Sequence, residues 1–320
     1  EKIKKQDAVY TVKDFHEKVR QLGTALYELG LGGKHVAIVS ENSYNWIVTF
    51  FAIVCGGGVA VPIDKELPDK DISMLISKGD AEAMFHSRTY KETAELHLSN
   101  DERCKYAVNM THNGKSAGGK FLTIDELCEM GKKLLEQGDR RFLDAEVKKD
   151  DLAAIVFTSG TTGYPKIACH SFKYALGHFV TAKYWHSIKP SDLHLTISDT
   201  GWGKALWGKL YGQWLCEGAV FTYDFDRFEA DKILPMFAKY GITTFCAPPT
   251  MYRMLIKQDL SKYDLSSIHH ATTAGEALNP EVFYKFEQAT GLRIAEGFGQ
   301  TEMTLGIANL VGTQLKPGAM

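Results

Sequence analysis

The apolar residues of this chain fall in short, nearly continuous runs separated by longer amphipathic stretches. The runs predict strands at 36–39, 59–63, 83–86, 106–110, 153–158, 193–197, 219–223, 243–246, 268–272 and 292–295. The amphipathic stretches predict helices at 12–29, 124–137, 228–240, 250–258 and 280–290, and the apolar stretch 46–55 predicts another. Strands that helices cover on both faces read as continuous apolar runs, and strand–helix–strand units make parallel sheets. We therefore expect an α/β fold of two packed, mostly parallel sheets with flanking helices in layers.

The charge balance and the cysteines exclude several classes of protein. Lys and Arg number 37 and Asp and Glu number 39, so the net charge is −2. That balance gives no electrostatic reason to expect nucleic acid as a partner. The longest apolar run, 46–55, is shorter than the roughly 20 residues of a membrane-spanning helix. The six cysteines show no metal-ligand spacing, which favours a reducing, cytoplasmic setting.

A loop rich in glycine and hydroxyl side chains follows the predicted strand 153–158. It consists of Thr158, Ser159, Gly160, Thr161, Thr162, Gly163, Tyr164, Pro165 and Lys166. The glycines let the backbone approach an anion, and Lys166 adds a positive charge. The spacing differs from that of a P-loop, and Pro165 argues against a helix directly after the glycines. The pattern predicts a polyphosphate-binding loop, with a surface linker as the alternative.

A second candidate site follows the predicted strand 292–295. Its residues are Glu296, Gly297, Phe298, Gly299, Gln300, Thr301 and Glu302. In parallel sheets, ligands bind beyond the carboxyl ends of the strands. There Phe298 can stack on a base, Thr301 can donate to a phosphate and Glu302 can hold Mg²⁺. The alternative is a tight turn. Gly275, Glu276 and Ala277 form a weaker third candidate after the predicted strand 268–272.

In order and spacing, these three motifs resemble those of the acyl-adenylate-forming superfamily, over essentially the whole chain. That superfamily includes acyl-CoA synthetases, luciferases and the adenylation domains of peptide synthetases. Segments 198–207, 247–254 and 316–318 are similar to short- and medium-chain acyl-CoA synthetases, whereas 61–68 resembles bacterial synthetases for long chains. The resemblance leaves the acyl chain length open.

The resemblance implies an ATP-dependent acyl-CoA synthetase, which makes an acyl-adenylate from a carboxylic acid and then a thioester with CoA. It implies that 158–166 bind the β- and γ-phosphates, that 275–277 border the adenine and that 296–301 contact base and α-phosphate. Lys166, Thr301 and Glu302 are then the expected catalytic residues, with Mg²⁺ on Glu302. The expected border of the acyl pocket is formed by Trp202, Ala247, Pro248 and Thr250.

The resemblance also implies a domain organisation. A first subdomain is expected at 37–185, and a second at 1–36 plus 186–320. Full-length members of the superfamily continue past 316–318 into a C-terminal domain with further ligand-binding residues. The chain thus resembles an N-terminal domain, expected to bind ATP or AMP weakly and to turn over poorly by itself.

Several alternatives stay open at this point. The chain can be a nucleotide-binding sensor without turnover, or an adenylation domain that activates amino acids. Its oligomeric state is open, with a homodimer among the options. His170, four residues after Lys166, either is satisfied by the backbone or faces the carboxylate pocket.

Overall fold

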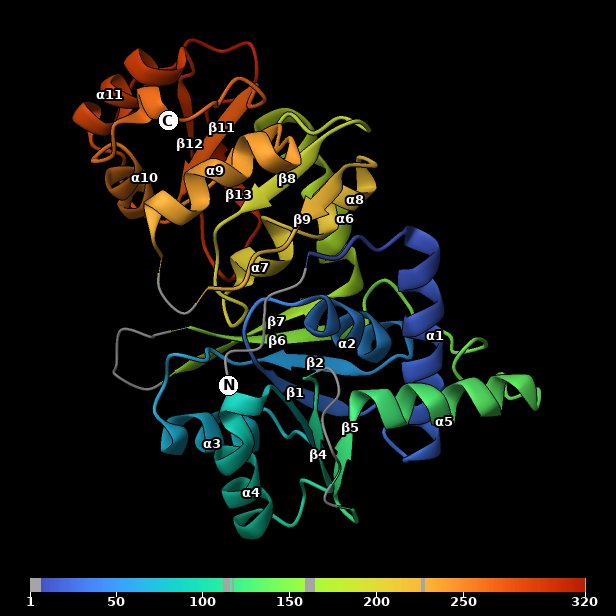
Figure 1. The fold of residues 1–320 in the computed structure, drawn as a ribbon. Coiled ribbons are helices and arrows are strands. Elements are labelled where there is room, and N and C mark those ends of the chain that lie inside the picture. Colours follow the sequence, from blue (N-terminus) through green and yellow to red (C-terminus); the bar gives the residue numbers. More distant parts are fainter. Residues whose placement is uncertain (1–6, 112–115, 117, 159–164, 226–227, 320) are drawn as a thin grey trace. The chain divides into compact units, whose positions relative to one another are not determined.

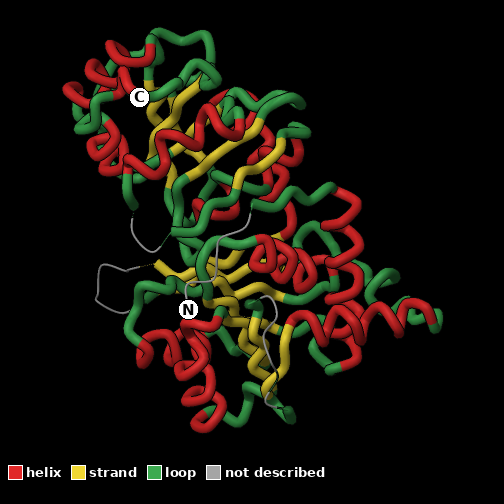
Figure 2. Tube along the Cα trace, in the orientation of Figure 1, coloured by secondary structure: helices red, strands yellow, loops and turns green. Residues whose placement is uncertain are grey.

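A computed structural model describes residues 7–111, 116, 118–158, 165–225 and 228–319 (Figure 1). Its strands form two sheets, and helices flank both (Figure 2). The first has the order β5-β4-β3-β1-β2-β6-β7 and the second the order β13-β12-β11-β10-β8-β9. The strands of the first sheet are β1 (His35–Val39), β2 (Val59–Pro62), β3 (Ala83–His86), β4 (Tyr106–Asn109), β5 (Phe121–Thr123), β6 (Leu152–Thr158) and β7 (Lys166–Ser171). Those of the second are β8 (Leu193–Thr196), β9 (Ala219–Phe221), β10 (Thr244–Cys246), β11 (His270–Ala274), β12 (Ile294–Gly299) and β13 (Leu305–Ala308).

Helices connect most of these strands. They are α1 (Val12–Glu28), α2 (Tyr44–Cys55), α3 (Asp69–Lys78), α4 (Lys91–Asn100), α5 (Ile124–Glu136), α6 (Phe172–Val180), α7 (Gly203–Trp207), α8 (Tyr211–Leu215), α9 (Ala230–Tyr240), α10 (Pro249–Leu255) and α11 (Pro280–Thr290). A π-helical turn, Thr181–Trp185, continues α6, and short 3₁₀ turns lie at Arg88–Tyr90 and Leu260–Lys262. Among the described helices, none has the length and apolar character needed to cross a bilayer.

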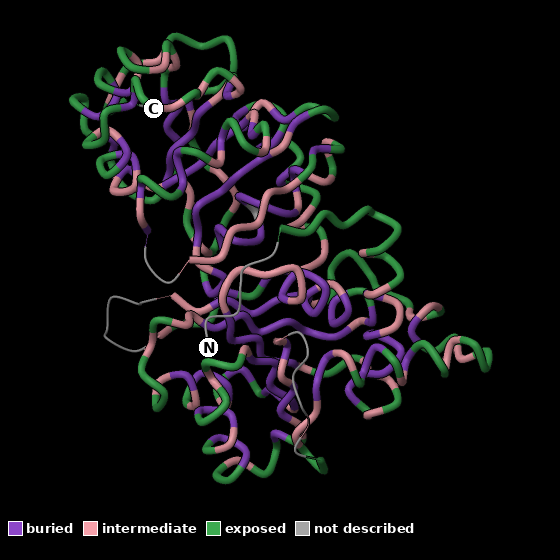
Figure 3. The backbone as a smooth tube through the Cα atoms, viewed as in Figure 1, coloured by how far each residue is buried: buried purple, intermediate pink, exposed green. Residues whose placement is uncertain are grey.

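The strand directions confirm the predicted fold class. In the first sheet, β1 pairs in parallel with β3, β3 with β4, and β4 with β5. At the other end of this sheet, β6 and β7 pair antiparallel. In the second sheet, β9, β8, β10, β11 and β12 are parallel, and β13 is antiparallel to β12. Most strand residues are buried (Figure 3). That burial explains why the strands read as continuous apolar runs.

Local sequence signals fix several helix ends. The Thr11 side chain caps α1 in a capping box with Asp14, and Thr123 caps α5 in the same way. Each box satisfies two backbone groups that a helix start leaves without partners. At the other end of a helix, Gly291 adopts φ +73° after α11, a left-handed conformation that glycine reaches without steric cost.

The chain divides into two compact units, and the division differs from the predicted subdomains. One unit comprises 1–40, 44–61 and 69–147, and the other comprises 41–43, 62–68 and 148–320. Residues 1–36 therefore group with the first unit, because α1 packs beside α5 and α2 (Figure 1). Residues 148–185 group with the second unit, where α6 packs on α8. The predicted boundaries at 36 and 185 do not describe these units.

Candidate functional site

The carboxyl ends of the parallel strands in the second sheet gather the predicted site segments along one edge. Cys246 at the end of β10 lies in register with Thr196 of β8 and with Thr272 of β11. Thr273 of β11 lies in register with Glu296 of β12. The segments that follow these strands carry Trp202, residues 247–250, residues 275–277 and residues 300–302, while residues 296–299 form the end of β12 itself. Neighbouring strands thus place the acyl-pocket, adenine and metal candidates at the same edge of the sheet.

The predicted phosphate loop connects the two antiparallel strands β6 and β7. Thr158, the last residue of β6, pairs with Lys166, the first residue of β7. Lys166 is exposed, and it begins a strand rather than a helix, as the position of Pro165 predicts. The predicted ligand-binding residues Ser159, Gly160, Thr161, Thr162, Gly163 and Tyr164 lie outside the described residues.

The β7 arm of this hairpin contacts the turn that carries Glu302. The buried His170 of β7 donates from Nε2 to the carbonyl oxygen of Thr301 at 2.7 Å. Its ring stacks on Tyr174, at 3.8 Å between ring centroids, and the Tyr174 hydroxyl donates to the Met303 carbonyl oxygen at 3.4 Å. Burial lowers the pKa of His170, although the charge of Glu302 opposes the shift. His170 is thus satisfied by the backbone, and it links the two predicted phosphate-binding segments.

The residues of the β12 motif divide between the interior and the surface. Glu296 is only 3% exposed, and its carboxylate accepts from the backbone N–H groups of Leu278 at 3.0 Å and Gly318 at 2.8 Å. A Cβ on Gly297 would lie 2.7 Å from the Trp185 ring, so only glycine fits there. Phe298, Gln300 and Glu302 are exposed, and Gly299 and Thr301 are half-buried. The motif therefore combines a buried anchor with exposed groups.

The segment after β11 contacts the segment after β10. Gly275 adopts φ +109°, which side chains with a Cβ rarely reach. The Glu276 carboxylate accepts from the Thr250 hydroxyl at 2.8 Å and from Arg253 at 3.2 Å. The structure thus brings the adenine candidate Glu276 and the acyl-pocket candidate Thr250 together, while Ala277 follows on the exposed side. Sequence reasoning missed Arg253, which lies one helical turn after Thr250.

The other acyl-pocket candidates lie at the ends of β10 and β8. Ala247 is buried, and its backbone bonds to β11, accepting from the Thr273 hydroxyl at 2.8 Å. Pro248 follows it and is half-buried. Trp202 is 53% exposed, and its indole N–H donates to the Asp64 carboxylate at 3.0 Å. Ala247 therefore shapes the strand end, and Trp202 presents an aromatic surface.

Two buried lysines near this edge were not anticipated from the sequence. Lys204 is 7% exposed and donates to the carbonyl oxygen of Ala274, the last residue of β11, at 3.1 Å. Lys209 is 3% exposed and donates to the Asn42 side chain; burial lowers its pKa to about 8. Lysine is almost never fully buried without a partner, and both of these have one. A lysine in an otherwise apolar stretch, as in 203–210, is the signal that could have identified them.

The residues around Glu302 fit a magnesium ion that ATP helps to hold. Among the described residues, the exposed Glu302 carboxylate has no hydrogen-bond or ion-pair partner, and no group of three or more His, Cys, Asp or Glu side chains converges. Mg²⁺ keeps several waters and usually binds through one or two carboxylates plus substrate phosphates. A single free carboxylate in the turn that β7 contacts suits that chemistry better than it suits zinc or calcium.

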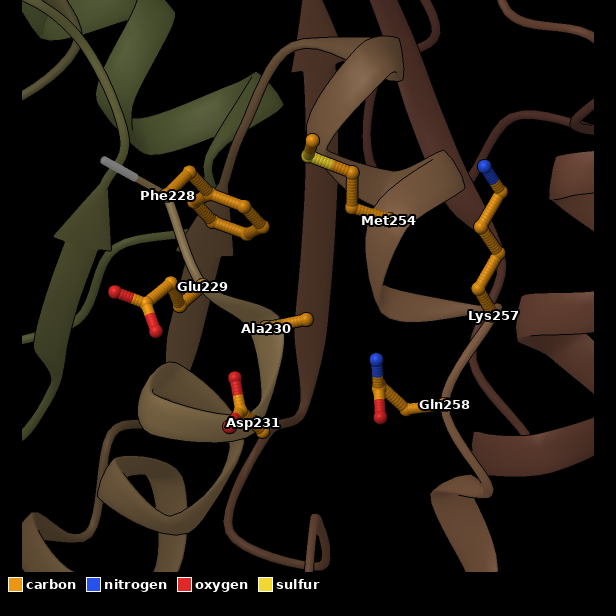
Figure 4. A pocket seen from close by; sticks show the side chains of 7 residues that line it. All are labelled: Phe228, Glu229, Ala230, Asp231, Met254, Lys257 and Gln258. Atoms are coloured by element: carbon orange, nitrogen blue, oxygen red, sulfur yellow. The ribbon is translucent and has the colours of Figure 1, made fainter.

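A separate hollow of about 490 Å³ opens in the second unit between the start of α9 and the end of α10 (Figure 4). Phe228 and Met254 give it an apolar part, and acidic and basic side chains complete its wall. Its lining residues are Phe228, Glu229, Ala230, Asp231, Met254, Lys257 and Gln258. None of the predicted site residues lines it, although Met254 shares α10 with Thr250.

Comparison with known proteins agrees with this geometry. The family model for AMP-binding enzymes matches residues 2–319. The chain is 32% identical over 289 residues to acyl-coenzyme A synthetase ACSM3, mitochondrial, of Homo sapiens, and 34% identical over 292 residues to the human ACSM4 protein of the same description. Each alignment covers 90% of this chain and 48% of the relative. The chain therefore belongs to the AMP-binding enzyme family, and it spans about half the length of these curated relatives.

Solved structures show the same fold. An anthranilate CoA ligase, AuaEII, in complex with anthranoyl-AMP superposes with a TM-score of 0.86 at 24% identity, over 98% of this chain and 60% of the ligase. An acyl-CoA synthetase of Brucella canis superposes with a TM-score of 0.80 at 20% identity, over 96% of this chain and 54% of the synthetase. The two-sheet architecture is thus shared with these enzymes.

Proposed function

We propose that the protein to which this chain belongs is an AMP-forming acyl-CoA synthetase. In the first step, a carboxylate oxygen attacks the α-phosphorus of ATP, the bond from that phosphorus to the bridging oxygen breaks, and pyrophosphate leaves. In the second, the sulfur of CoA attacks the acyl carbon, the thiol proton is lost, and AMP leaves. The curated relatives, both named acyl-coenzyme A synthetases, support this assignment.

The residue roles follow from the chemistry of the first step. A carboxylate is already a nucleophile, so the site must mainly position it and neutralise charge on the phosphates. In our proposal, Lys166 and the 158–165 loop hold the β- and γ-phosphates, and the Thr301 hydroxyl donates to the α-phosphate. Glu302 would hold Mg²⁺, which supplies charge neutralisation on the phosphate oxygens.

The remaining candidates would bind the two organic parts of the adenylate. We place the adenine against 275–277 and Phe298, and the acyl group against Trp202, Ala247, Pro248 and Thr250. Glu296 acts as an anchor rather than a ligand, because the backbone already occupies both of its oxygens. We also propose a reducing, cytoplasmic setting, which the six free cysteines support, although the names of the relatives include "mitochondrial".

One observation carries the proposal: the hydrogen bond from His170 to Thr301. It joins the strand that starts at Lys166 to the turn that holds Thr301 and Glu302. A hairpin unrelated to the β12 motif would have no reason to contact it through β7. The contact therefore favours a phosphate site over the alternative of a surface linker.

Exchange of labelled pyrophosphate into ATP tests the proposal. We expect exchange that depends on a fatty or aromatic carboxylic acid and on Mg²⁺, and that Lys166→Met and Glu302→Gln each reduce. A fragment of a two-domain synthetase would exchange slowly, so the same assay is run on a longer protein that contains the chain. Exchange driven by amino acids alone would indicate a peptide-synthetase adenylation domain. ATP binding with no exchange for any acid, in both forms, would indicate a sensor.

A further inference from the structure

The indole of Trp202 is an exposed aromatic group held in one orientation. Large aromatic side chains at a surface commonly serve as contact surfaces for ligands. Here 53% of Trp202 is exposed, yet its N–H donates to the Asp64 Oδ2 atom at 3.0 Å. The other oxygen of Asp64 accepts from the backbone N–H of Glu66 at 2.9 Å, which fixes the carboxylate itself. The ring is therefore anchored by its one polar atom to a carboxylate that cannot rotate freely.

The backbone on either side of Trp202 is fixed to the same segment. Gly201 packs so closely that a Cβ there would overlap the backbone of Asp64. Lys65 pairs with Asp199 at 3.6 Å, and the Lys65 side chain is only 10% exposed. Segment 199–202 thus lies directly on 64–65. Because the main chain is held on both sides of Trp202, the ring can move only by rotation about its side-chain bonds. The hydrogen bond to Asp64 restricts that rotation.

The next helical turn connects this loop to the proposed nucleotide site. Lys204, two residues after Trp202, donates to the carbonyl oxygen of Ala274 at 3.1 Å. Ala274 ends β11 and is followed directly by Gly275, the start of the proposed adenine border. The anchored indole therefore belongs to a loop tied to the strand end where the adenylate is proposed to lie. A change in the ring's orientation would alter the contact surface available to the acyl half of that adenylate.

We propose that Asp64 is a positioning residue that sets acyl selectivity through Trp202. This inference rests on the proposed function, because it takes the acyl group to lie against the indole. While Asp64 holds the N–H, the ring stays in one place and limits the length of the acyl group. Without the carboxylate the ring can rotate, so longer acyl groups gain room and short ones lose a rigid contact surface.

A series of non-hydrolysable acyl-adenylate mimics tests this directly. The acetyl, butyryl and octanoyl sulfamoyl adenosines share one nucleoside, so differences between them report the acyl site alone. Isothermal titration gives the ratio of octanoyl to butyryl affinity for each variant of this chain. We expect Asp64→Ala to raise that ratio about 3- to 10-fold, the range that one net hydrogen bond accounts for.

Three further variants separate positioning from loss of structure. Asp64→Asn keeps an acceptor oxygen for the indole and is expected to retain the wild-type ratio. Trp202→Phe removes only the N–H donor and part of the ring, so it should shift the ratio, and adding Asp64→Ala to it should change nothing more. Glu66→Ala removes a neighbouring exposed carboxylate and should leave the ratio unchanged.

The outcomes distinguish this inference from the proposed function. If the wild-type chain binds the mimics and Asp64→Ala leaves the ratio unaltered, the inference fails while the synthetase proposal stands. An equal shift in Glu66→Ala would also overturn it, because charge alone would then be responsible. If Asp64→Ala does not fold, the ratio of octanoyl to butyryl affinity is compared between Asp64→Asn and Trp202→Phe. A wild-type ratio in the first and a shifted ratio in the second support the inference, and a wild-type ratio in both overturns it. If no mimic binds the wild-type chain more tightly than AMP does, both proposals fail.

Discussion

His170 and Thr301 are 131 positions apart in sequence, yet the His170 Nε2 atom lies 2.7 Å from the Thr301 carbonyl oxygen. One residue belongs to β7, the strand that follows the proposed phosphate loop, and the other to the turn that bears the proposed metal ligand. A carbonyl oxygen held by a buried donor cannot turn away without losing that bond. The contact therefore holds the backbone of Thr301, from which the Thr301 hydroxyl and the Glu302 side chain extend.

Removing the His170 ring should loosen that turn. His170→Ala leaves the Thr301 carbonyl without its donor, and we expect Mg²⁺–ATP to bind about 10-fold more weakly, because an unmade buried hydrogen bond costs about 1–3 kcal/mol. Isothermal titration measures the effect. Cys169→Ala is the matched control, since Cys169 is the preceding, exposed residue of β7. Equal affinities for His170→Ala and the wild type would show that the contact does not order the phosphate site.

Glu296 should stabilise the fold far more than Glu302 does. Glu296→Ala leaves the buried N–H group of Leu278 and the part-buried N–H group of Gly318 without an acceptor, so we expect the free energy of unfolding to fall by about 3–5 kcal/mol, for two hydrogen bonds to a charged group. Glu296→Gln keeps one acceptor oxygen and should cost about half as much. Urea denaturation gives both values.

Glu302→Gln is the control for this comparison. Its exposed side chain should change the unfolding free energy by no more than about 0.5 kcal/mol, the usual size for surface positions. It should nevertheless weaken the Mg²⁺ dependence of ATP binding. A large stability loss in Glu302→Gln, or none in Glu296→Ala, would reverse the roles assigned to the two residues.

The sequence predicted the buried strands well, but it missed an edge strand and two polar helices. Strand β3 was predicted at its observed bounds, because it is buried on both faces and reads as one apolar run. Helix α11 was also predicted at its observed bounds, because Pro280 marks its first turn and Gly291 its C-terminal cap. Strand β7 was missed because its residues alternate between exposed and buried, and it pairs only with β6. Helices α3 and α4 were missed because few of their residues are apolar.

The candidate site shows the same division. Glycine and hydroxyl motifs after strands can be recognised locally, so the sequence could nominate the segments at 158–166, 275–277 and 296–302. The link from Asp64 to Trp202 spans 138 positions and depends on two loops crossing. No periodicity encodes such a crossing. The compact units differ from the predicted subdomains for a related reason: α1 packs on α5, and sequence alone does not state which helices pack together.

The packing of α1 on α5 depends on one small residue. A Cβ on Gly131 of α5 would overlap the carbonyl oxygen of Gln21 on α1. Alanine favours a helix by about 1 kcal/mol over glycine. We nevertheless expect Gly131→Ala to lower the free energy of unfolding by about 1–3 kcal/mol, because backbone atoms must move apart. Thermal denaturation measures the change. Gly177→Ala on α6 is the control, because a Cβ there meets only a threonine methyl group at 3.2 Å; this change should leave the free energy of unfolding unchanged or raise it. An equal loss of unfolding free energy in both variants would exclude close packing as the cause.

Two buried histidines, His194 of β8 and His178 of α6, should make the protein sensitive to mild acid. Burial lowers the pKa of His194 and of His178 to about 3 each. The neutral ring of His194 is satisfied on both sides: its Nε2 donates to the Gly208 carbonyl oxygen at 3.0 Å, and Thr244 donates to its Nδ1. In the unfolded chain the pKa returns to about 6.5, so the unfolded state binds more protons between pH 6.5 and pH 3, and stability falls as the pH falls through that window. Each such histidine contributes about 1.4 kcal/mol per pH unit. Urea denaturation at pH 7, 6 and 5 gives the slope of the unfolding free energy against pH. We expect His194→Gln to reduce that slope by about this amount. His16→Gln, on the exposed face of α1, should leave it unchanged. An unchanged slope in His194→Gln would mean that His194 is protonated in the folded protein.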